Sequence, residues 1–76
     1  MAAKGIARAI GAEIRSRRQA MGLSQEALAD AADLHRIFIG LLERGQRNIS
    51  LPTLQALAGA LKVTMTELVS RAERRL

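Results

Sequence analysis

Two short amphipathic patterns separated by a tight corner, in residues 24–45, constrain the fold of this chain more than any other feature. The first pattern predicts a helix over about 25–32, and the second predicts a helix over about 36–44 that stops at a glycine. Ile39 and Leu42 recur at helical spacing and give the second helix a buried stripe. We therefore expect two helices that meet at a steep angle.

The residues at the crossing and at the corner fit this geometry. Helices that cross steeply need a small residue where they meet, and Ala29 supplies one. The corner needs a residue that tolerates a positive φ. We expect Asp33 to adopt one, because Asp is among the few residues that visit left-handed backbone space. The spacing is that of a helix-turn-helix motif, which in a small basic chain favours DNA binding.

Capping residues and apolar periodicity predict further helices and no strands. Ser24 and Ser50 are good N-caps, and Thr64 with Glu67 three residues later forms a capping box. Gly22 ends the first apolar pattern at its C-terminal side. We therefore expect one all-α domain over residues 1–76, a compact five-helix bundle with helices over about 5–21, 25–32, 36–44, 51–61 and 65–74.

The composition indicates the kind of core and the kind of partner. Hydrophobic residues make up 49% of the chain and aromatic residues only 1%, so the core must consist of Leu, Ile, Val, Ala and Met. Twelve Lys and Arg against seven Asp and Glu give a formal net charge of +5, which favours a polyanionic partner. No apolar run approaches the roughly 20 residues of a membrane span. We expect a cytoplasmic protein without membrane contact.

The residue types that build catalytic or metal sites are scarce. The chain has one histidine and no cysteine, and it contains no glycine-rich phosphate loop and no set of converging carboxylates. We therefore expect that the protein is not an enzyme and that it uses no cofactor, metal or small-molecule ligand.

Four segments carry a family resemblance when they are taken in order: IRSRRQAMGLSQEALA, ERGQRN, SLPTLQALAGAL and VTMTELV. From about Ile10 to Val69 the chain resembles the Cro/CI-type (XRE) helix-turn-helix family of phage repressors and bacterial regulators, although Asp33 stands where that family usually has glycine. The run DLHRIFIGLLERGQRNISL is also similar to the controller proteins of restriction–modification systems.

The resemblance implies both a fold and a function. The fold is a lambda-repressor-like domain. The function is that of a sequence-specific DNA-binding transcriptional regulator. Such a protein binds double-stranded DNA as a homodimer, reads an inverted-repeat operator and places the helix over 36–44 in the major groove.

The family comparison assigns base contacts to Arg36, Ile37 and Leu41 on the outward face of that helix. Arginine can place two donors on guanine, and apolar groups can contact thymine methyls. Two alternatives are open. Arg36 could be a phosphate contact or a solvated residue, and Ile37 with Leu41 could be a patch for a protein partner, as in an antitoxin. Gly40 either permits a close approach to DNA or is merely tolerated.

Other polar residues near the motif are candidates for contacts with the DNA backbone. They are Gln25, Arg44, Arg47 and Asn48, with His35, Arg15 and Arg17 as weaker candidates. Phe38, the only aromatic residue, is expected to pack at the border of the core, with a DNA contact as the alternative.

Two structural contacts complete the expectations. The resemblance implies a partly buried ion pair between Arg18 and Glu43 that joins the first helix to the third, the alternative being two exposed charges. The dimer surface should come from the helix over 65–74 and the end of the helix before it. Its candidate residues are Leu68, Val69, Ala72 and Leu76, of which the first two could belong to the core instead.

Overall fold

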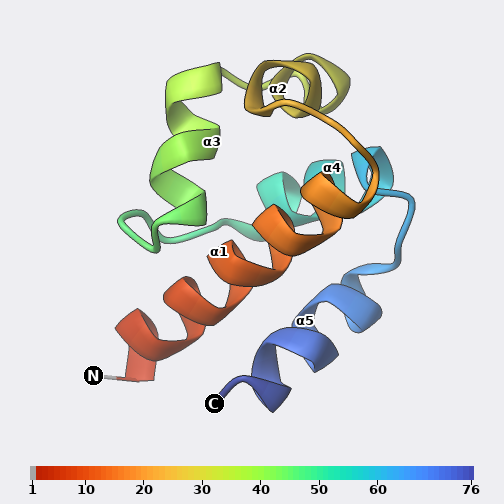
Figure 1. The fold of residues 1–76 in the computed structure, drawn as a ribbon. Helices are drawn as coiled ribbons and strands as arrows, with labels where there is room; N and C mark the ends of the chain where they lie inside the picture. The colour runs from red at the N-terminus through yellow and green to blue at the C-terminus, as the bar shows by residue number, and fades with distance from the viewer. Residues whose placement is uncertain (1) are drawn as a thin grey trace.

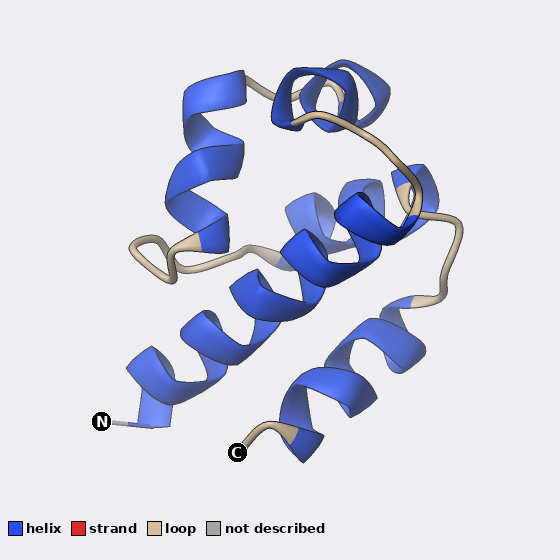
Figure 2. Cartoon of the chain, in the orientation of Figure 1, coloured by secondary structure: helices blue, strands red, loops and turns tan. Residues whose placement is uncertain are grey.

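The computed structural model describes the backbone of residues 2–76 and the side chains of residues 5–76. The regular structure of this part consists of helices, without a strand (Figure 1, Figure 2). The helices are α1 (Ala2–Ala20), α2 (Gln25–Ala32), α3 (Arg36–Glu43), α4 (Leu51–Ala60) and α5 (Met65–Arg74). The all-α fold class is therefore confirmed, and the main difference from the expected bounds is that α1 begins at residue 2 rather than at 5.

Each of the helices α2–α5 begins at a side chain that accepts a backbone hydrogen bond. Ser24 and Ser50 each accept from the N–H three residues later. Thr64 accepts from the Glu67 N–H at 3.0 Å, and the Glu67 carboxylate accepts from the Thr64 N–H at 3.1 Å, which completes the predicted capping box. These local bonds explain why the sequence predicted the helix starts so closely.

The first four helices end in the same way, at a residue with a left-handed backbone. These residues are Gly22 (φ +71°), Asp33 (+57°), Gly45 (+69°) and Lys62 (+59°). In each case the next N–H reaches back to the carbonyl five residues before it, as in a Schellman motif. Glycine adopts this conformation freely, whereas a side chain adds steric cost. The positive φ predicted for Asp33 is confirmed.

The other helices are arranged around α1, the longest. It packs against α3 and α5, while α2 packs against α3 and α4. Figure 1 shows α2 and α3 together above α1 and α5 below it, with the start of α1 and the end of α5 at one end of the molecule. An ion pair of 2.7 Å between Arg75 Nε and Glu13 Oε1 fastens the C-terminal residues to α1. The helix-turn-helix and α5 therefore lie on different sides of the domain.

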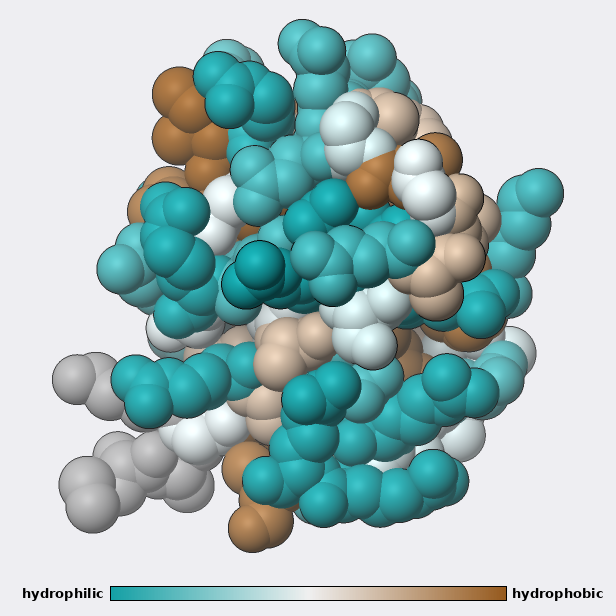
Figure 3. Space-filling model, in the orientation of Figure 1, coloured by the Kyte–Doolittle hydropathy of each residue, from teal (hydrophilic) through white to brown (hydrophobic). Residues whose placement is uncertain are grey.

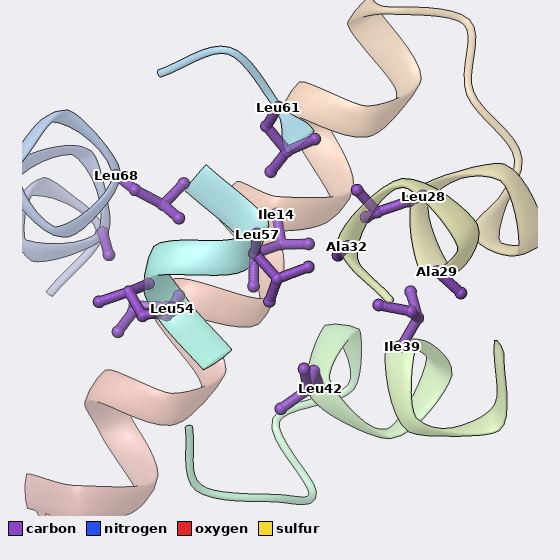
Figure 4. Packing of buried hydrophobic residues seen from close by; sticks show 13 residues of the cluster. Ile14, Leu28, Ala29, Ala32, Ile39, Leu42, Leu54, Leu57, Leu61 and Leu68 are labelled. Atoms are coloured by element: carbon purple, nitrogen blue, oxygen red, sulfur yellow. The ribbon is translucent and has the colours of Figure 1, made fainter. Parts of the chain in front are cut away.

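The core consists of aliphatic side chains from every helix (Figure 4). The largest fully buried side chains are Ile14, Leu28, Ile39, Leu57, Leu61 and Leu68. Phe38 is half-buried and packs against this core, as predicted for a residue at its border. The core thus has the aliphatic composition that the scarcity of aromatic residues required.

Gly11 marks a close helix contact that the sequence did not reveal. A Cβ built on this residue of α1 would overlap the backbone oxygen of Leu42 and lie 3.0 Å from that of Glu43. Only a residue without a side chain lets α1 approach the C-terminal end of α3 this closely. Gly11 therefore sets the position of α3 on the domain.

Candidate nucleic-acid interface

The corner between α2 and α3 is fixed by backbone hydrogen bonds and by His35. The Leu34 N–H donates to the Ala29 carbonyl at 2.8 Å across the left-handed Asp33. His35 is the N-cap of α3, and its Nδ1 accepts a hydrogen bond of 3.1 Å from the Ile37 N–H. The second ring nitrogen, Nε2, makes no hydrogen bond within the part of the chain that the structure describes.

The outward face of α3 carries the residues predicted to contact bases. Arg36 is exposed, and Ile37 is 59% exposed although its side chain is apolar. Figure 3 shows apolar surface among polar side chains over the N-terminal end of α3, at the upper left of the view. Leu41, one turn further on, is only half-buried, whereas Ile39 and Leu42 on the opposite face are buried. The residues that protrude most therefore lie at the start of α3.

The predicted ion pair between Arg18 and Glu43 is present and almost entirely buried. Arg18 Nε lies 2.6 Å from Glu43 Oε2, and Arg18 Nη2 donates to Glu43 Oε1 at 3.0 Å. Arg18 Nη1 also donates to the Leu23 carbonyl at 2.8 Å. The hydrogen bonds to Glu43 raise the pKa of Arg18, so the guanidinium stays charged. This pair joins α1 to the last residue of α3 and to the loop before α2.

Gln25 takes part in the same network, which sequence reasoning missed. Its Nε2 donates to Glu43 Oε1 at 3.1 Å, so one carboxylate holds the first residue of α2 as well as α1. A Cβ on the buried Gly40 would lie 3.7 Å from Gln25 Oε1 and 3.3 Å from Arg44 Nη1. Gly40 thus leaves room for two polar side chains, a role that neither sequence interpretation of this glycine included.

The segment after α3 presents further positive charge. Arg44, Arg47 and Asn48 are exposed, as a contact with phosphate requires. Arg44 Nε donates to Gln46 Oε1 at 3.2 Å, and the Arg47 guanidinium lies over the Phe38 ring, 5.5 Å from its centre. Both arginines are therefore oriented by neutral partners and keep their charge available.

Arg17 has a structural contact that makes it a poor candidate for DNA. Its Nε donates to the Leu61 carbonyl at 3.0 Å and so caps the C-terminal end of α4. Arg15 remains exposed on α1 without an ion pair among the described residues.

Ala72, which was predicted for the dimer surface, lies in the core of a single chain, which is a correction, and Leu68 takes the core position that the sequence left open for it. Leu68 is 1% exposed and Ala72 is 0% exposed, because this face of α5 packs inward. Leu76 is 73% exposed and Val69 is half-buried. Val69 lines a shallow groove between α4 and α5 together with Leu51, which is 72% exposed. The accessible apolar surface of this groove therefore centres on Leu51 and Val69, whereas Leu76 lies beside Gly5 of α1.

No helix in the described part of the chain is long and apolar enough to cross a membrane. Within residues 2–76, no group of three or more His, Cys, Asp or Glu side chains is arranged to hold a metal ion.

A helix-turn-helix family model matches residues 14–68. Control protein C.SmaI from Serratia marcescens is 47% identical over 58 residues, which cover 76% of this chain and 69% of that protein. Control protein C.MunI from Mycoplasma sp is 38% identical over 58 residues, covering 76% of this chain and 78% of the relative.

Solved structures agree with this match. The restriction-modification controller protein C.AhdI from Aeromonas hydrophila superposes with a TM-score of 0.80 and 45% identity, over 82% of this chain and 94% of that one. The clp gene regulator ClgR from Corynebacterium glutamicum gives a TM-score of 0.89 with 27% identity, over 92% of this chain and 74% of that one. The chain therefore belongs to the XRE-type helix-turn-helix family, whose members are DNA-binding transcription regulators and not enzymes.

Proposed function

We propose that this protein is a controller of a restriction–modification system that binds an inverted-repeat operator as a homodimer, with α3 in the major groove. The observation that carries the proposal is the exposed Arg36–Ile37 pair at the start of α3, on a helix whose other end is fixed by the buried Arg18–Glu43 ion pair. The similarity to proteins named as control or controller proteins supports the specific role.

Arg36 and Ile37 are the proposed base-reading residues. An arginine that projects from the start of a recognition helix can donate to guanine O6 and N7 together, a contact worth about 1–3 kcal/mol of discrimination. An exposed isoleucine beside it can contact a thymine methyl. Leu41 is half-buried and one turn away, so its proposed contact is at the edge of the same surface.

The proposed backbone contacts surround this pair on both sides. Arg44, Arg47 and Asn48 follow α3, while Gln25 begins α2, where free helix N–H groups also favour phosphate. His35 accepts from the Ile37 N–H through Nδ1, which leaves Nε2 as the ring nitrogen that can donate to a phosphate. These contacts would set the register of α3 without reading sequence.

A dimer would place two copies of α3 on one face of the duplex. Half-sites in such operators lie about 34 Å apart, one helical turn, and the two-fold axis of the protein coincides with that of the repeat. The accessible apolar side chains of Leu51 and Val69, in the groove between α4 and α5, support a partner surface there.

The experiment is selection of binding sites from a random duplex library at near-physiological salt. The proposal predicts enrichment of an inverted repeat by the wild type and loss of that enrichment by Arg36→Ala. Arg74→Ala, which removes the same charge from α5, is the matched control and should select the wild-type repeat. Failure of the wild type to enrich any motif contradicts the proposal.

The exposure of Ile37 also supports a second candidate, a small interaction module that binds a protein in the manner of an antitoxin. Salt distinguishes the two. Binding to DNA weakens steeply as salt rises, because counterions are released from the phosphates, whereas an apolar protein contact at Ile37 is much less sensitive.

A further inference from the structure

A concave surface at the edge of the predicted interface collects arginines from two distant parts of the sequence. It lies where the loop between α3 and α4 passes beside the N-terminal half of α1, to the left of α1 in Figure 1. Its polar lining residues are Arg8, Arg44, Gln46, Arg47 and Asn48. Arg8 comes from α1 and had no assigned role, while the others follow α3.

The charge in this concavity is not compensated within the described part of the chain. The ion pairs in the described residues are made by Arg18 and Arg75, and neither arginine lines the concavity. No acidic residue lines the surface. Three arginines line this concave surface without a carboxylate beside them, so its positive charge is uncompensated and a bound anion would be attracted to it.

Gly45 fixes the position of Arg8 relative to the loop. A Cβ on Gly45 would lie 2.7 Å from the Cα of Arg8 and 3.2 Å from its backbone nitrogen, so the loop lies directly on α1 at this residue. The backbone of Gly45 is also left-handed, with φ +69°. Glycine therefore permits both the turn and the contact, and the base of the Arg8 side chain is held at a defined distance from the loop arginines.

We propose that Arg8 is an additional phosphate contact and that this concavity holds a backbone phosphate of duplex DNA between α1 and the loop after α3. The inference rests on the proposed function. DNA is the source of the phosphate because the concavity begins at Arg44, the residue directly after α3, and so continues the surface that carries the base-reading pair. Phosphates flank any helix inserted into the major groove.

The test is the salt dependence of binding to the selected operator and to an unrelated duplex. Each phosphate contact adds about 0.9 to the slope of log affinity against log salt. Arg8→Ala should lower the magnitude of this slope by about that amount and should weaken binding to both duplexes by the same factor. The ratio of the wild-type affinity to the variant affinity should therefore shrink about threefold between 50 and 200 mM salt. Arg8→Lys should restore most of the slope, since phosphate also accepts a point charge.

Arg74→Ala on α5 is the control and should keep the wild-type slope. Arg8 is exposed, so unchanged circular dichroism and melting are expected for its variants. A wild-type slope and affinity for Arg8→Ala, alongside normal DNA binding by the wild type, overturns the proposal and leaves the proposed function intact. Absence of salt-dependent DNA binding by the wild type contradicts the proposed function itself. Inorganic phosphate that shifts the amide resonances of residues 44–48, with the Arg8→Ala slope unchanged, identifies a free-anion site and also overturns the proposal.

Discussion

The side-chain amide of Gln25 donates to Glu43 Oε1 at 3.1 Å, and this is the oxygen that also receives Arg18 Nη2 at 3.0 Å. The first residue of α2 is thereby tied to the last residue of α3. One buried carboxylate fixes the positions of three helices relative to one another, which means that the ion pair stabilises the domain and also sets the angle of the helix-turn-helix.

Gln25→Ala removes one hydrogen bond from this network and should cost about 1 kcal/mol of unfolding free energy. Its larger effect should be on DNA, because the proposed phosphate contact of Gln25 is lost and the start of α2 is no longer held against α3. Affinity for the operator is measured beside urea unfolding, with Gln55→Ala on the exposed face of α4 as the control. If Gln25→Ala lowers stability and leaves affinity at the wild-type value, the network has no part in positioning the motif.

Glu43→Ala leaves the Arg18 guanidinium buried without its carboxylate, and we expect a loss of about 3–5 kcal/mol in unfolding free energy. Arg18→Met combined with Glu43→Leu should be much less destabilising than the two single changes summed, because no charge is left unpaired. Urea unfolding of the wild type, Arg18→Met, Glu43→Leu and the double variant forms the cycle, and Glu43→Ala is measured beside them. An unchanged stability of Glu43→Ala contradicts a buried pair.

Gly11→Ala and Gly59→Ala should act in opposite directions. The new methyl at Gly11 would overlap the Leu42 backbone oxygen, so α1 and α3 must separate and we expect strong destabilisation. Gly59 lies near the end of α4 with nothing within 4 Å of its added Cβ, and alanine there should stabilise the helix by up to about 1 kcal/mol. Thermal unfolding compares the two variants. Equal changes in melting temperature would show that the close contact between Gly11 and the Leu42 backbone oxygen is absent.

Lys62→Gly should stabilise the protein by about 0.5–1 kcal/mol, because Lys62 has φ +59° and glycine removes the left-handed penalty. Asp33→Gly, at φ +57°, should gain less, since aspartate tolerates this conformation better. Ala31→Gly, an exposed position inside α2, is the control and should destabilise. A loss of stability in Lys62→Gly would contradict the account of the helix ends.

The capping box of α5 should make stability depend on acid. The Thr64 backbone N–H, followed by its hydroxyl, lowers the pKa of Glu67 because both favour the charged carboxylate. The folded pKa is depressed, so this contribution is present above the unfolded value of about 4.3 and is lost as pH falls through the folded pKa. Glu67→Gln keeps the capping bonds and should show a flatter decline in unfolding free energy between about pH 5 and 3. Parallel declines would refute this assignment.

The sequence predicted features that depend on neighbouring residues. Caps such as Ser24 and Thr64 act within one helical turn, and the left-handed Asp33 follows from the corner it occupies. For this reason the helices and the motif were predictable without any knowledge of packing.

Features that depend on distant residues were not predictable in the same way. Nothing near Gly11 in the sequence reveals the carbonyl of α3 that touches it, and nothing near Arg17 reveals the end of α4 that it caps. An apolar face such as that of Leu68 and Ala72 shows that something covers it, but periodicity does not distinguish the protein's own core from a second copy.

The most direct test of the central claim is base substitution in the operator, measured with wild type and Arg36→Ala. Each half-site contains one guanine that Arg36 is proposed to read. Replacing this base pair by any of the other three should cost the wild type about 1–3 kcal/mol of binding free energy. Arg36→Ala should bind the original operator more weakly and bind all four versions of that position equally. If Arg36→Ala discriminates among the four as strongly as the wild type at every position of the half-site, Arg36 does not read a base and the proposed role of α3 is wrong.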